Sequence, residues 1–234
     1  MMPYFADREV ASRSALEASG IVAGMRLHRY AAAALVAVLS ACGDSLMFEP
    51  VPAGSIVLAF GDSVTYGTGA GRGEDYPSRL AELTGWQVRN AGVPGDTARE
   101  ATARIADAIA ETGAAIVIIE LGGNDFLRRR SGADVKEDLR AIIRSVRDAG
   151  ALPVLVSVPQ LSVLGAVTGR LTDAPIYAEL AAEERVLLVE DVFAEVLSDV
   201  ALRADPIHPN AEGYRVLAAR IAGELERAGL LAPR

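Results

Sequence analysis

The chain contains few cysteines and histidines, the residues on which disulfide-linked and zinc-binding proteins depend. It has one cysteine, Cys42, among 234 residues, so an internal disulfide is excluded. It has two histidines, and one of them, His28, lies in what looks like a removable leader. With one imidazole and no free cysteine expected in the mature chain, we expect neither a zinc site nor any other cofactor.

The balance of charge limits the partners. Acidic residues number 31 against 23 Lys and Arg, which gives a formal net charge of -8, and no block of basic residues stands out. Because nucleic-acid-binding surfaces carry clustered Lys and Arg, nucleic acid is not an expected partner. The chain is long enough for one α/β domain with a sizeable core, and no stretch is typical of an inter-domain linker.

The first 41 residues have the features of a secretory signal. Arg26 and Arg29 precede an apolar stretch over 30–41, which is too short to span a bilayer. The stretch runs into the segment 39–43 (Leu-Ser-Ala-Cys-Gly), which resembles a bacterial lipobox. We therefore predict that Cys42 becomes the lipidated first residue of the mature chain. The alternative is an ordinary signal peptide with an incidental cysteine.

This leader predicts an organisation and a location. Acidic residues within 1–24 are unusual ahead of a signal sequence, so Met25 is the expected start of translation. Residues 42–54 are rich in Pro and Gly and predict a tether, which leaves 55–234 as the globular domain. A lipid anchor would hold this domain at the membrane of the bacterial cell envelope, facing the periplasm. Gly43 after the cysteine favours the outer membrane, by analogy with enteric sorting.

Beyond residue 54, apolar runs alternate with helical patterns. Runs rich in Val, Ile and Leu predict strands at 55–60, 87–90, 115–121, 152–158 and 186–189. The intervening patterns predict helices at 76–83, 98–111, 135–149, 175–184, 192–197 and 211–228. Continuous apolar runs are typical of strands buried on both faces. The alternation therefore predicts an α/β fold in which helices cover both faces of a parallel sheet.

Four short polar blocks follow the predicted strands or lie near their ends. They are 61–63 (Gly-Asp-Ser), 90–97 (Asn-Ala-Gly-Val-Pro-Gly-Asp-Thr), 122–125 (Gly-Gly-Asn-Asp) and 205–208 (Asp-Pro-Ile-His). Alone, each of the first three blocks is also compatible with a plain turn or a helix cap, and the fourth with a lone surface histidine. The first is not the G-x-S-x-G elbow of α/β-hydrolases, because Thr65 stands where that motif needs glycine.

The residue types in these blocks suggest acyl transfer. The carboxyl ends of parallel strands share one edge, where ligands bind, and Ser63 would lie on a turn there. His208 is the only imidazole outside the leader that could act as its base, and Asp205 is spaced to orient that ring. Gly92 would let a backbone N–H approach a ligand closely, and the Asn124 amide could donate a hydrogen bond to an oxyanion.

Taken together, the blocks resemble those of the SGNH (GDSL) hydrolase family, from about residue 56 to the C-terminus. Within the family they look most like the bacterial thioesterase/lysophospholipase-type arylesterases. The shared features are Gly67 with the Tyr76-Pro77 pair, the segments 95–97 and 120–125, and the ending 207–210. One departure is Val64, where the family name has Leu; it should pack equivalently. The resemblance implies a three-layer flavodoxin-like sandwich with a five-stranded parallel sheet.

The resemblance also implies roles for the site residues. Ser63 would be the nucleophile, His208 the base and Asp205 its orienting acid. The oxyanion hole would consist of the N–H groups of Ser63 and Gly92 and the Asn124 side chain.

The implied activity is hydrolysis of carboxylic esters or thioesters through an acyl-enzyme. Lysophospholipids, aryl esters and acyl thioesters are the expected substrates. The apolar segment 161–169 either lines a groove for the acyl chain or packs against the core. One alternative is a carbohydrate O-acetylesterase acting on cell-envelope glycans. Another is a non-enzymatic envelope lipoprotein that uses the fold for binding, although such a protein would not need the full set of catalytic residues.

Overall fold

The computed structural model describes residues 48–160 and 170–231. Its centre is a five-stranded sheet in the order β2-β1-β3-β4-β5, with every neighbouring pair parallel. The strands are β1 (Ile56–Gly61), β2 (Gln87–Gly92), β3 (Ile116–Glu120), β4 (Leu152–Val156) and β5 (Leu187–Val189). The predicted parallel sheet is thereby confirmed. The predicted leader, Cys42 and the segment 161–169 lie outside the described residues.

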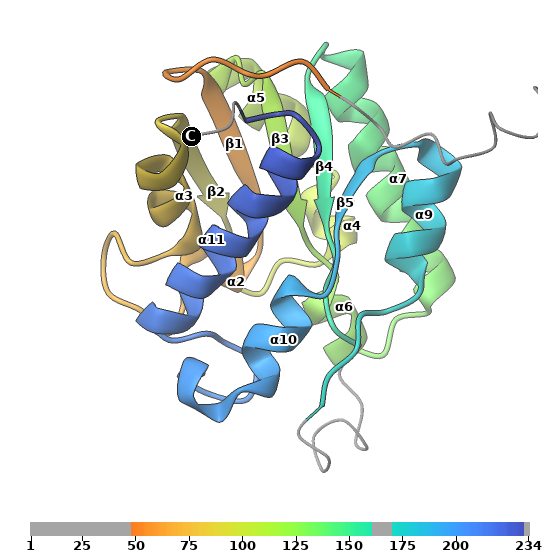
Figure 1. The fold of residues 1–234 in the computed structure, drawn as a ribbon. Coiled ribbons are helices and arrows are strands. Elements are labelled where there is room, and N and C mark those ends of the chain that lie inside the picture. Colours follow the sequence, from red (N-terminus) through yellow and green to blue (C-terminus); the bar gives the residue numbers. More distant parts are fainter. Residues whose placement is uncertain (1–47, 161–169, 232–234) are drawn as a thin grey trace, which may run out of the picture. The chain divides into compact units, whose positions relative to one another are not determined.

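Helices cover both faces of the sheet (Figure 1). One layer contains α3 (Tyr76–Thr84), α10 (Val192–Ser198) and α11 (Ala211–Arg227), with α11 packed along α3. The other contains α4 (Ala98–Ala101), α5 (Ile105–Thr112), α7 (Gly132–Asp148) and α9 (Ile176–Glu184). The central strands β1, β3 and β4 are almost wholly buried, whereas the edge strand β2 is half exposed. The expected three-layer architecture is confirmed.

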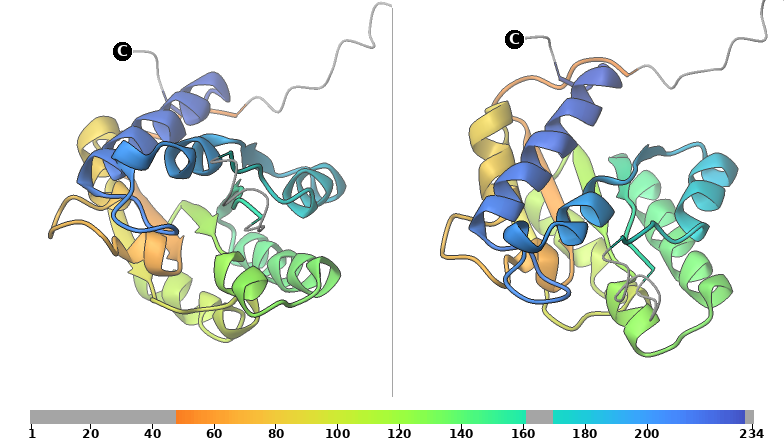
Figure 2. Two further views of the ribbon diagram at one scale, coloured as in Figure 1. Left: turned by 90° about the horizontal axis from the view of Figure 1, so that it is seen from below. Right: turned by 60° about the horizontal axis from the view of Figure 1, so that its bottom comes forward.

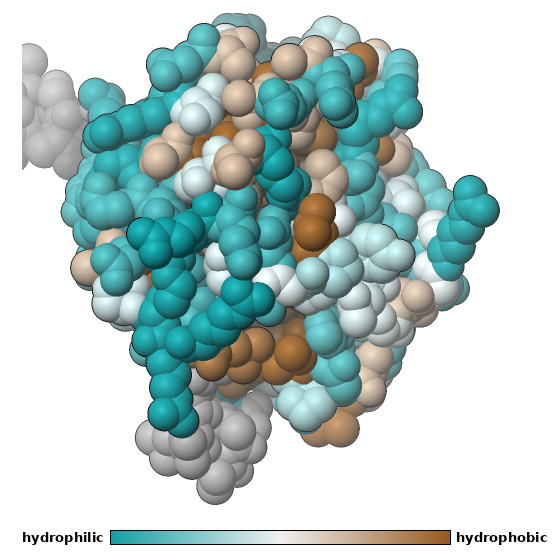
Figure 3. Space-filling model, turned by 180° about the vertical axis from the view of Figure 1, so that it is seen from behind, coloured by the Kyte–Doolittle hydropathy of each residue, from teal (hydrophilic) through white to brown (hydrophobic). Residues whose placement is uncertain are grey.

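Helix α7 shows why these segments fold as they do. In α7, the apolar side chains recur every three or four residues, and all of that stripe is buried against the sheet: Val135, Leu139, Ile142, Ile143 and Val146. The outer face of this layer is largely hydrophilic, with a group of apolar side chains near its lower edge (Figure 3). Of the helices in the described part of the chain, none has the length and hydropathy of a membrane span.

One predicted helix is interrupted. The segment 98–111 was expected to be continuous, but it forms α4 and α5 with three turn residues, 102–104, between them. The backbone tightens there, since the Ala103 and Arg104 N–H groups donate to carbonyls three residues earlier. The Thr102 hydroxyl also donates to the Arg99 carbonyl, 2.7 Å away, which competes with regular helix formation. The break leaves Arg104 at the start of α5, beside the ends of β1 and β2.

The packed domain also begins before Ser55. The Phe48 N–H donates to the Ala228 carbonyl at 3.0 Å, and the Val51 N–H donates to the Leu230 carbonyl at 2.9 Å. These bonds fasten the end of the predicted tether to the residues that follow α11.

Three short helical elements were not predicted from the sequence pattern. Helix α2 (Ser63–Tyr66) follows β1, α6 (Gly123–Leu127) follows β3, and the 3₁₀ turn η1 (Val200–Leu202) follows α10. Each is shorter than two turns, so none shows the apolar repeat that identifies longer helices. Seen from the carboxyl edge of the sheet, α2, α6 and α10 lie around the strand ends (Figure 2).

Candidate active site

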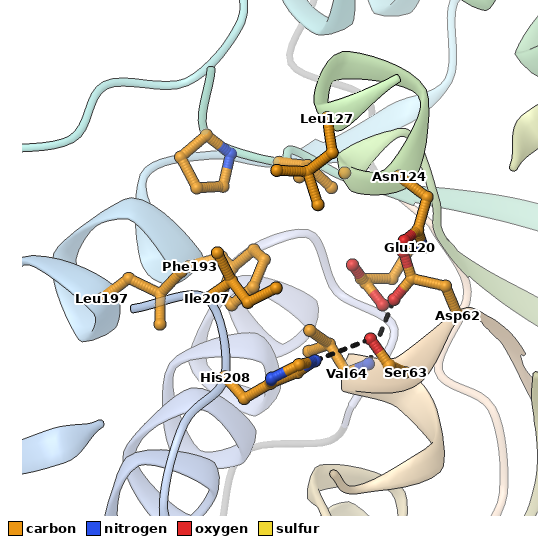
Figure 4. Close-up of a pocket in the computed structure, with 13 residues that line it drawn as sticks. Asp62, Ser63, Val64, Glu120, Asn124, Leu127, Phe193, Leu197, Ile207 and His208 are labelled. Atoms are coloured by element: carbon orange, nitrogen blue, oxygen red, sulfur yellow. Dashed lines mark hydrogen bonds between the residues drawn. The ribbon is translucent and has the colours of Figure 1, made fainter. Parts of the chain in front are cut away.

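The first, third and fourth polar blocks meet in a cavity at the carboxyl edge of the sheet. Ser63 begins α2 directly after β1, Asn124 belongs to α6 after β3, and His208 lies in the loop between η1 and α11. All three line this cavity, together with Asp62 and Glu120 (Figure 4). Residues separated by more than 140 positions are thus brought into hydrogen-bonding distance.

The turn that presents Ser63 is tight because β1 ends in a glycine. A Cβ atom on Gly61 would lie 2.0 Å from Thr65 Oγ1 and 2.4 Å from the Glu120 carbonyl oxygen, so no other residue fits. Asp62 then caps α2, since its Oδ1 accepts the Val64 N–H at 3.0 Å. The Ser63 N–H has no acceptor among the described residues. It therefore remains available to a ligand.

Ser63, His208 and Asp205 form a hydrogen-bonded chain. The Ser63 hydroxyl lies 2.9 Å from His208 Nε2, and His208 Nδ1 lies 2.7 Å from Asp205 Oδ2. If Nδ1–H donates to the carboxylate, Nε2 is left as the acceptor for the serine proton. The structure thus brings the three predicted residues together in the order that general-base activation of a serine requires.

The loop that carries His208 is held by hydrogen bonds between its own residues. Asp205 Oδ1 accepts the N–H groups of Ile207 and His208, each at 2.9 Å, and the Ala204 N–H donates to the His208 carbonyl. Burial raises the pKa of Asp205, but the hydrogen bonds from His208 and Ile207 outweigh it, so the net pKa lies below its usual value. Asp205 is therefore ionised at neutral pH and stabilises a protonated His208.

Asn124 is held on the other side of the serine. Its amide Nδ2 donates to Asp62 Oδ2 and to the Asp96 carbonyl oxygen, both at 2.9 Å. The neighbouring Asp125 is fully buried, accepts the Ala98 N–H at 2.8 Å, and pairs with Arg130. These contacts fix the position of α6 and hence the direction in which the Asn124 amide points.

Gly92 does not take the place that the sequence predicts for it. Its N–H donates to Asn90 Oδ1 at 2.9 Å, and the residue does not line the cavity. The glycine serves packing instead, because a Cβ there would lie 2.2 Å from the Tyr66 backbone nitrogen. A side chain at this position would therefore push β2 away from α2.

Gly95, in the same block, is the better backbone donor. Every other backbone N–H between residues 92 and 98 already has an acceptor. Gly92 donates to Asn90, Val93 to Gly61, Asp96 to Val93, Thr97 to Glu100 and Ala98 to Asp125. Gly95 has a φ of 86°, and its N–H has no acceptor among the described residues. It directly precedes Asp96, whose carbonyl holds Asn124. The Pro-Gly pair, a turn signal ahead of a helix, could have directed attention to it.

Two buried carboxyl groups lie beneath the site. Glu120, at the end of β3, is 2 % exposed, and its Oε2 accepts the Thr65 hydroxyl at 2.9 Å; its Oε1 has no partner among the described residues. Burial raises the pKa of Glu120 well above its usual range, and the charge of Asp62 raises it further. Burial also raises the pKa of Asp62, to about 6. Burial thus disfavours the charged form of both carboxyl groups.

The wall opposite the polar residues is apolar. It is formed by residues from α6, from the segment after β4, from α10 and from the histidine loop. These are Leu127; Val158 and Pro159; Phe193 and Leu197; and Ile207 (Figure 4). Such a wall suits the hydrocarbon part of a ligand. Whether the segment 161–169 extends it is outside the described residues. Across 48–160 and 170–231, no three His, Cys, Asp or Glu side chains gather as a metal site.

A serine that is hydrogen-bonded to a histidine, which in turn is bonded to an aspartate, at the carboxyl edge of a parallel sheet is the arrangement of a serine hydrolase. Comparison with known proteins shows to which family of serine hydrolases the chain belongs. Residues 59–216 match the model of the GDSL-like lipase/acylhydrolase family, and this span is more than half of the chain. The chain belongs to that family, and it is a hydrolase that acts on ester bonds.

Its relatives carry related activities in their names. The chain is 32% identical to Esterase TesA of Pseudomonas aeruginosa over 181 residues, which cover 74% of this chain and 88% of the relative. It is 31% identical to Thioesterase 1/protease 1/lysophospholipase L1 of Escherichia coli K12 over 179 residues, covering 74% and 85%. The solved structure of TesA superposes with a TM-score of 0.65 at 27% identity, covering 74% of this chain and 99% of that one.

Proposed function

We propose that this protein hydrolyses acyl esters, such as lysophospholipids, aryl esters or acyl thioesters, with Ser63 as the group that is acylated. The observation that carries the proposal is the 2.9 Å contact between the Ser63 hydroxyl and His208 Nε2, at the foot of an apolar wall. The names of the relatives, an esterase, a thioesterase/lysophospholipase and an arylesterase, support the same range of substrates.

In the first half of the reaction, Ser63 Oγ attacks the carbonyl carbon while its proton passes to His208 Nε2. The ester C–O or thioester C–S bond then breaks, and the protonated His208 gives its proton to the leaving alcohol or thiol. Asp205 stabilises the imidazolium between these two transfers. In the second half, His208 takes a proton from water, which attacks the acyl-serine carbonyl. The bond from the acyl carbon to Ser63 Oγ then breaks, and His208 returns the proton to Oγ, which releases the acid and restores the enzyme.

The negative charge on the carbonyl oxygen needs donors at each tetrahedral step. We assign this role to the N–H groups of Ser63 and Gly95 and to the Asn124 amide. Asn124 lines the cavity, and its Nδ2 group can give up the contact with Asp62 Oδ2 in order to donate to the oxyanion. One such donor is worth about 3–4 kcal/mol of transition-state stabilisation.

The apolar wall favours an acyl chain over an acetyl group. An acetyl ester would leave these side chains without a partner, whereas a longer chain would cover them at about 0.8 kcal/mol per buried methylene. This favours a lipid-type or aryl ester over the acetyl groups of envelope glycans. Hydrolysis of p-nitrophenyl esters of graded length tests the choice. We expect kcat/KM to rise from acetate to longer chains; a maximum at acetate would support the O-acetylesterase alternative.

Leu127→Ala should weaken this preference. Leu127 lines the cavity and is 49% exposed, so its truncation removes contact with the acyl chain and little of the core. We expect the octanoate-to-acetate ratio of kcat/KM to fall by about tenfold. Val200→Ala is the matched control, because Val200 is 72% exposed and does not line the cavity. An unchanged ratio in the Leu127 variant would remove this wall from the acyl site.

We also propose, from the sequence alone, that the mature chain is anchored in the cell envelope through a lipidated Cys42. One acyl chain binds membranes only marginally, so stable anchoring needs two or more. Cys42→Ser should therefore give a soluble or unprocessed protein whose domain still hydrolyses esters. Labelling with palmitate followed by detergent partitioning tests this. Unlabelled wild-type protein in the aqueous phase would show that the leader is an ordinary signal peptide.

A further inference from the structure

Arg104 has no part in the reaction steps above, yet its guanidinium contacts three pieces of the scaffold around the serine. Its Nε donates to Asp96 Oδ2 at 2.7 Å. Its Nη1 donates to the Ala91 carbonyl and its Nη2 to the Gly61 carbonyl, both at 2.8 Å. Two of these acceptors are backbone atoms at the ends of β2 and β1.

Two of these contacts, to Gly61 and Asp96, lead directly to groups that we assign to the oxyanion hole. Gly61 is separated from Ser63 only by Asp62, and its carbonyl also accepts the Val93 N–H at 3.1 Å. Asp96 follows Gly95, and its own carbonyl accepts the Asn124 amide. One guanidinium therefore joins the turn that carries the serine to the loop that carries Gly95 and holds Asn124.

The surroundings of Arg104 strengthen these bonds. The guanidinium carbon lies 4.0 Å from the centroid of the Phe60 ring, and the side chains of Arg104 and Asp96 are only 26% and 11% exposed. Limited access to water makes a charge-assisted bond stronger and its geometry better defined. A lysine could stack on the ring or reach one acceptor, but its single ammonium could not span all three.

We propose that Arg104 is a positioning residue of the oxyanion hole, which holds the Gly95 loop and the Asn124 amide in register with Ser63. The need for it follows from the edge of the sheet. The loop after β2 is half exposed, and within residues 93–96 a single backbone bond, from Val93 to Gly61, ties it to β1. Oxyanion donors must be preorganised where the charge develops, so this loop requires a second fastening. The inference rests on the proposed function of the site.

Arg104→Ala should therefore lower kcat far more than it changes KM. A misplacement of about 1 Å in a catalytic site costs about 10²-fold in rate, and we expect a loss of this size in kcat. Arg104 does not line the cavity, so KM should change by less than about threefold. Guanidinium ion, added at non-denaturing concentrations, should restore part of kcat by filling the vacated space. Rescue of this kind is not expected for a side chain that serves stability alone.

Arg140→Ala is the matched control. Arg140 is also largely buried and pairs with three carboxylates, Glu137, Glu183 and Glu184, but it joins α7 to α9, away from the cavity. Its loss should lower the melting temperature without changing kcat and without a response to guanidinium.

Two milder variants keep the test decisive if Arg104→Ala does not fold. Arg104→Lys retains the charge but loses two of the three contacts, and Asp96→Asn keeps the carbonyl that binds Asn124 while weakening the ion pair. Both should lower kcat by about tenfold or more at unchanged KM. Wild-type kcat in every folded variant would overturn the proposal for Arg104 and leave the esterase intact. An inactive wild-type protein would instead overturn the proposed function itself.

Discussion

Replacing Ser63 by alanine is expected to abolish ester hydrolysis, with kcat falling by a factor on the order of 10⁶. The hydroxyl is the atom that attacks, and no neighbouring side chain at the cavity offers a second activated nucleophile: of the described residues, Ser63 alone contacts His208 Nε2. The fold should be unaffected, because the cap of α2 is supplied by Asp62 and the turn by Gly61.

The measurement is hydrolysis of a p-nitrophenyl ester by the full-length chain, alongside thermal unfolding and labelling by a fluorophosphonate. Ser145→Ala is the matched control, since the Ser145 hydroxyl only donates to the Ala141 carbonyl on the surface of α7. A Ser63→Ala protein that retains more than a small fraction of wild-type activity and labels normally would show that another residue is the nucleophile.

His208→Ala should come close to the same loss, and Asp205→Ala should cost less. His208 performs both proton transfers, whereas Asp205 orients the ring and stabilises its charge. Removal of the aspartate in other serine hydrolases lowers kcat by about 10⁴-fold. Asp205 is 46% exposed, so water can replace part of its effect, and we expect a loss of about 10²- to 10⁴-fold.

Steady-state kinetics of the two variants over a range of pH tests this order. In the wild-type protein, kcat/KM should fall in acid, since a protonated His208 cannot accept the serine proton. This dependence should disappear in the His208→Ala protein along with most of the activity. Wild-type kinetics in that variant would contradict the assignment, because the chain holds no other histidine outside its predicted leader.

The strands could be predicted closely because their sequences carry little ambiguity. The run 115–121 contains four consecutive Ile and Val residues, and it forms the fully buried β3 at 116–120. The helix 98–111 was harder, since its apolar repeat continues through residues 102–104 where the backbone tightens. Besides the local bond of the Thr102 hydroxyl, Arg104 bonds there to the ends of two strands that are distant in the sequence. Periodicity along the chain cannot show such a contact.

In the site, too, some residues could be predicted from the sequence and others only from the folded structure. Ser63 could be proposed from its place after a predicted strand, and Asp205 and His208 from their residue types and mutual spacing, and the structure brings the three together. The choice between Gly92 and Gly95 depends on which N–H is already bonded, and that is decided by the Asn90 side chain in three dimensions.

The buried acids were hidden for a similar reason. Glu120 stands at the end of an apolar run, where sequence alone suggests the boundary of a strand rather than a carboxyl of raised pKa beneath the cavity. The raised pKa follows from burial and from the neighbouring Asp62, which lies 58 positions earlier in the chain. The pairing of two carboxyl groups under a nucleophile is therefore visible only in the folded protein.

The most direct test of the central claim is to identify the residue that becomes covalently modified. The full-length protein is treated with a fluorophosphonate until activity is lost, then digested, and the modified peptide is mapped by mass spectrometry. We predict one phosphonyl group per chain, on Ser63, appearing in proportion to the loss of activity. Complete inactivation with an unmodified Ser63 and the phosphonyl group on another residue would contradict the account.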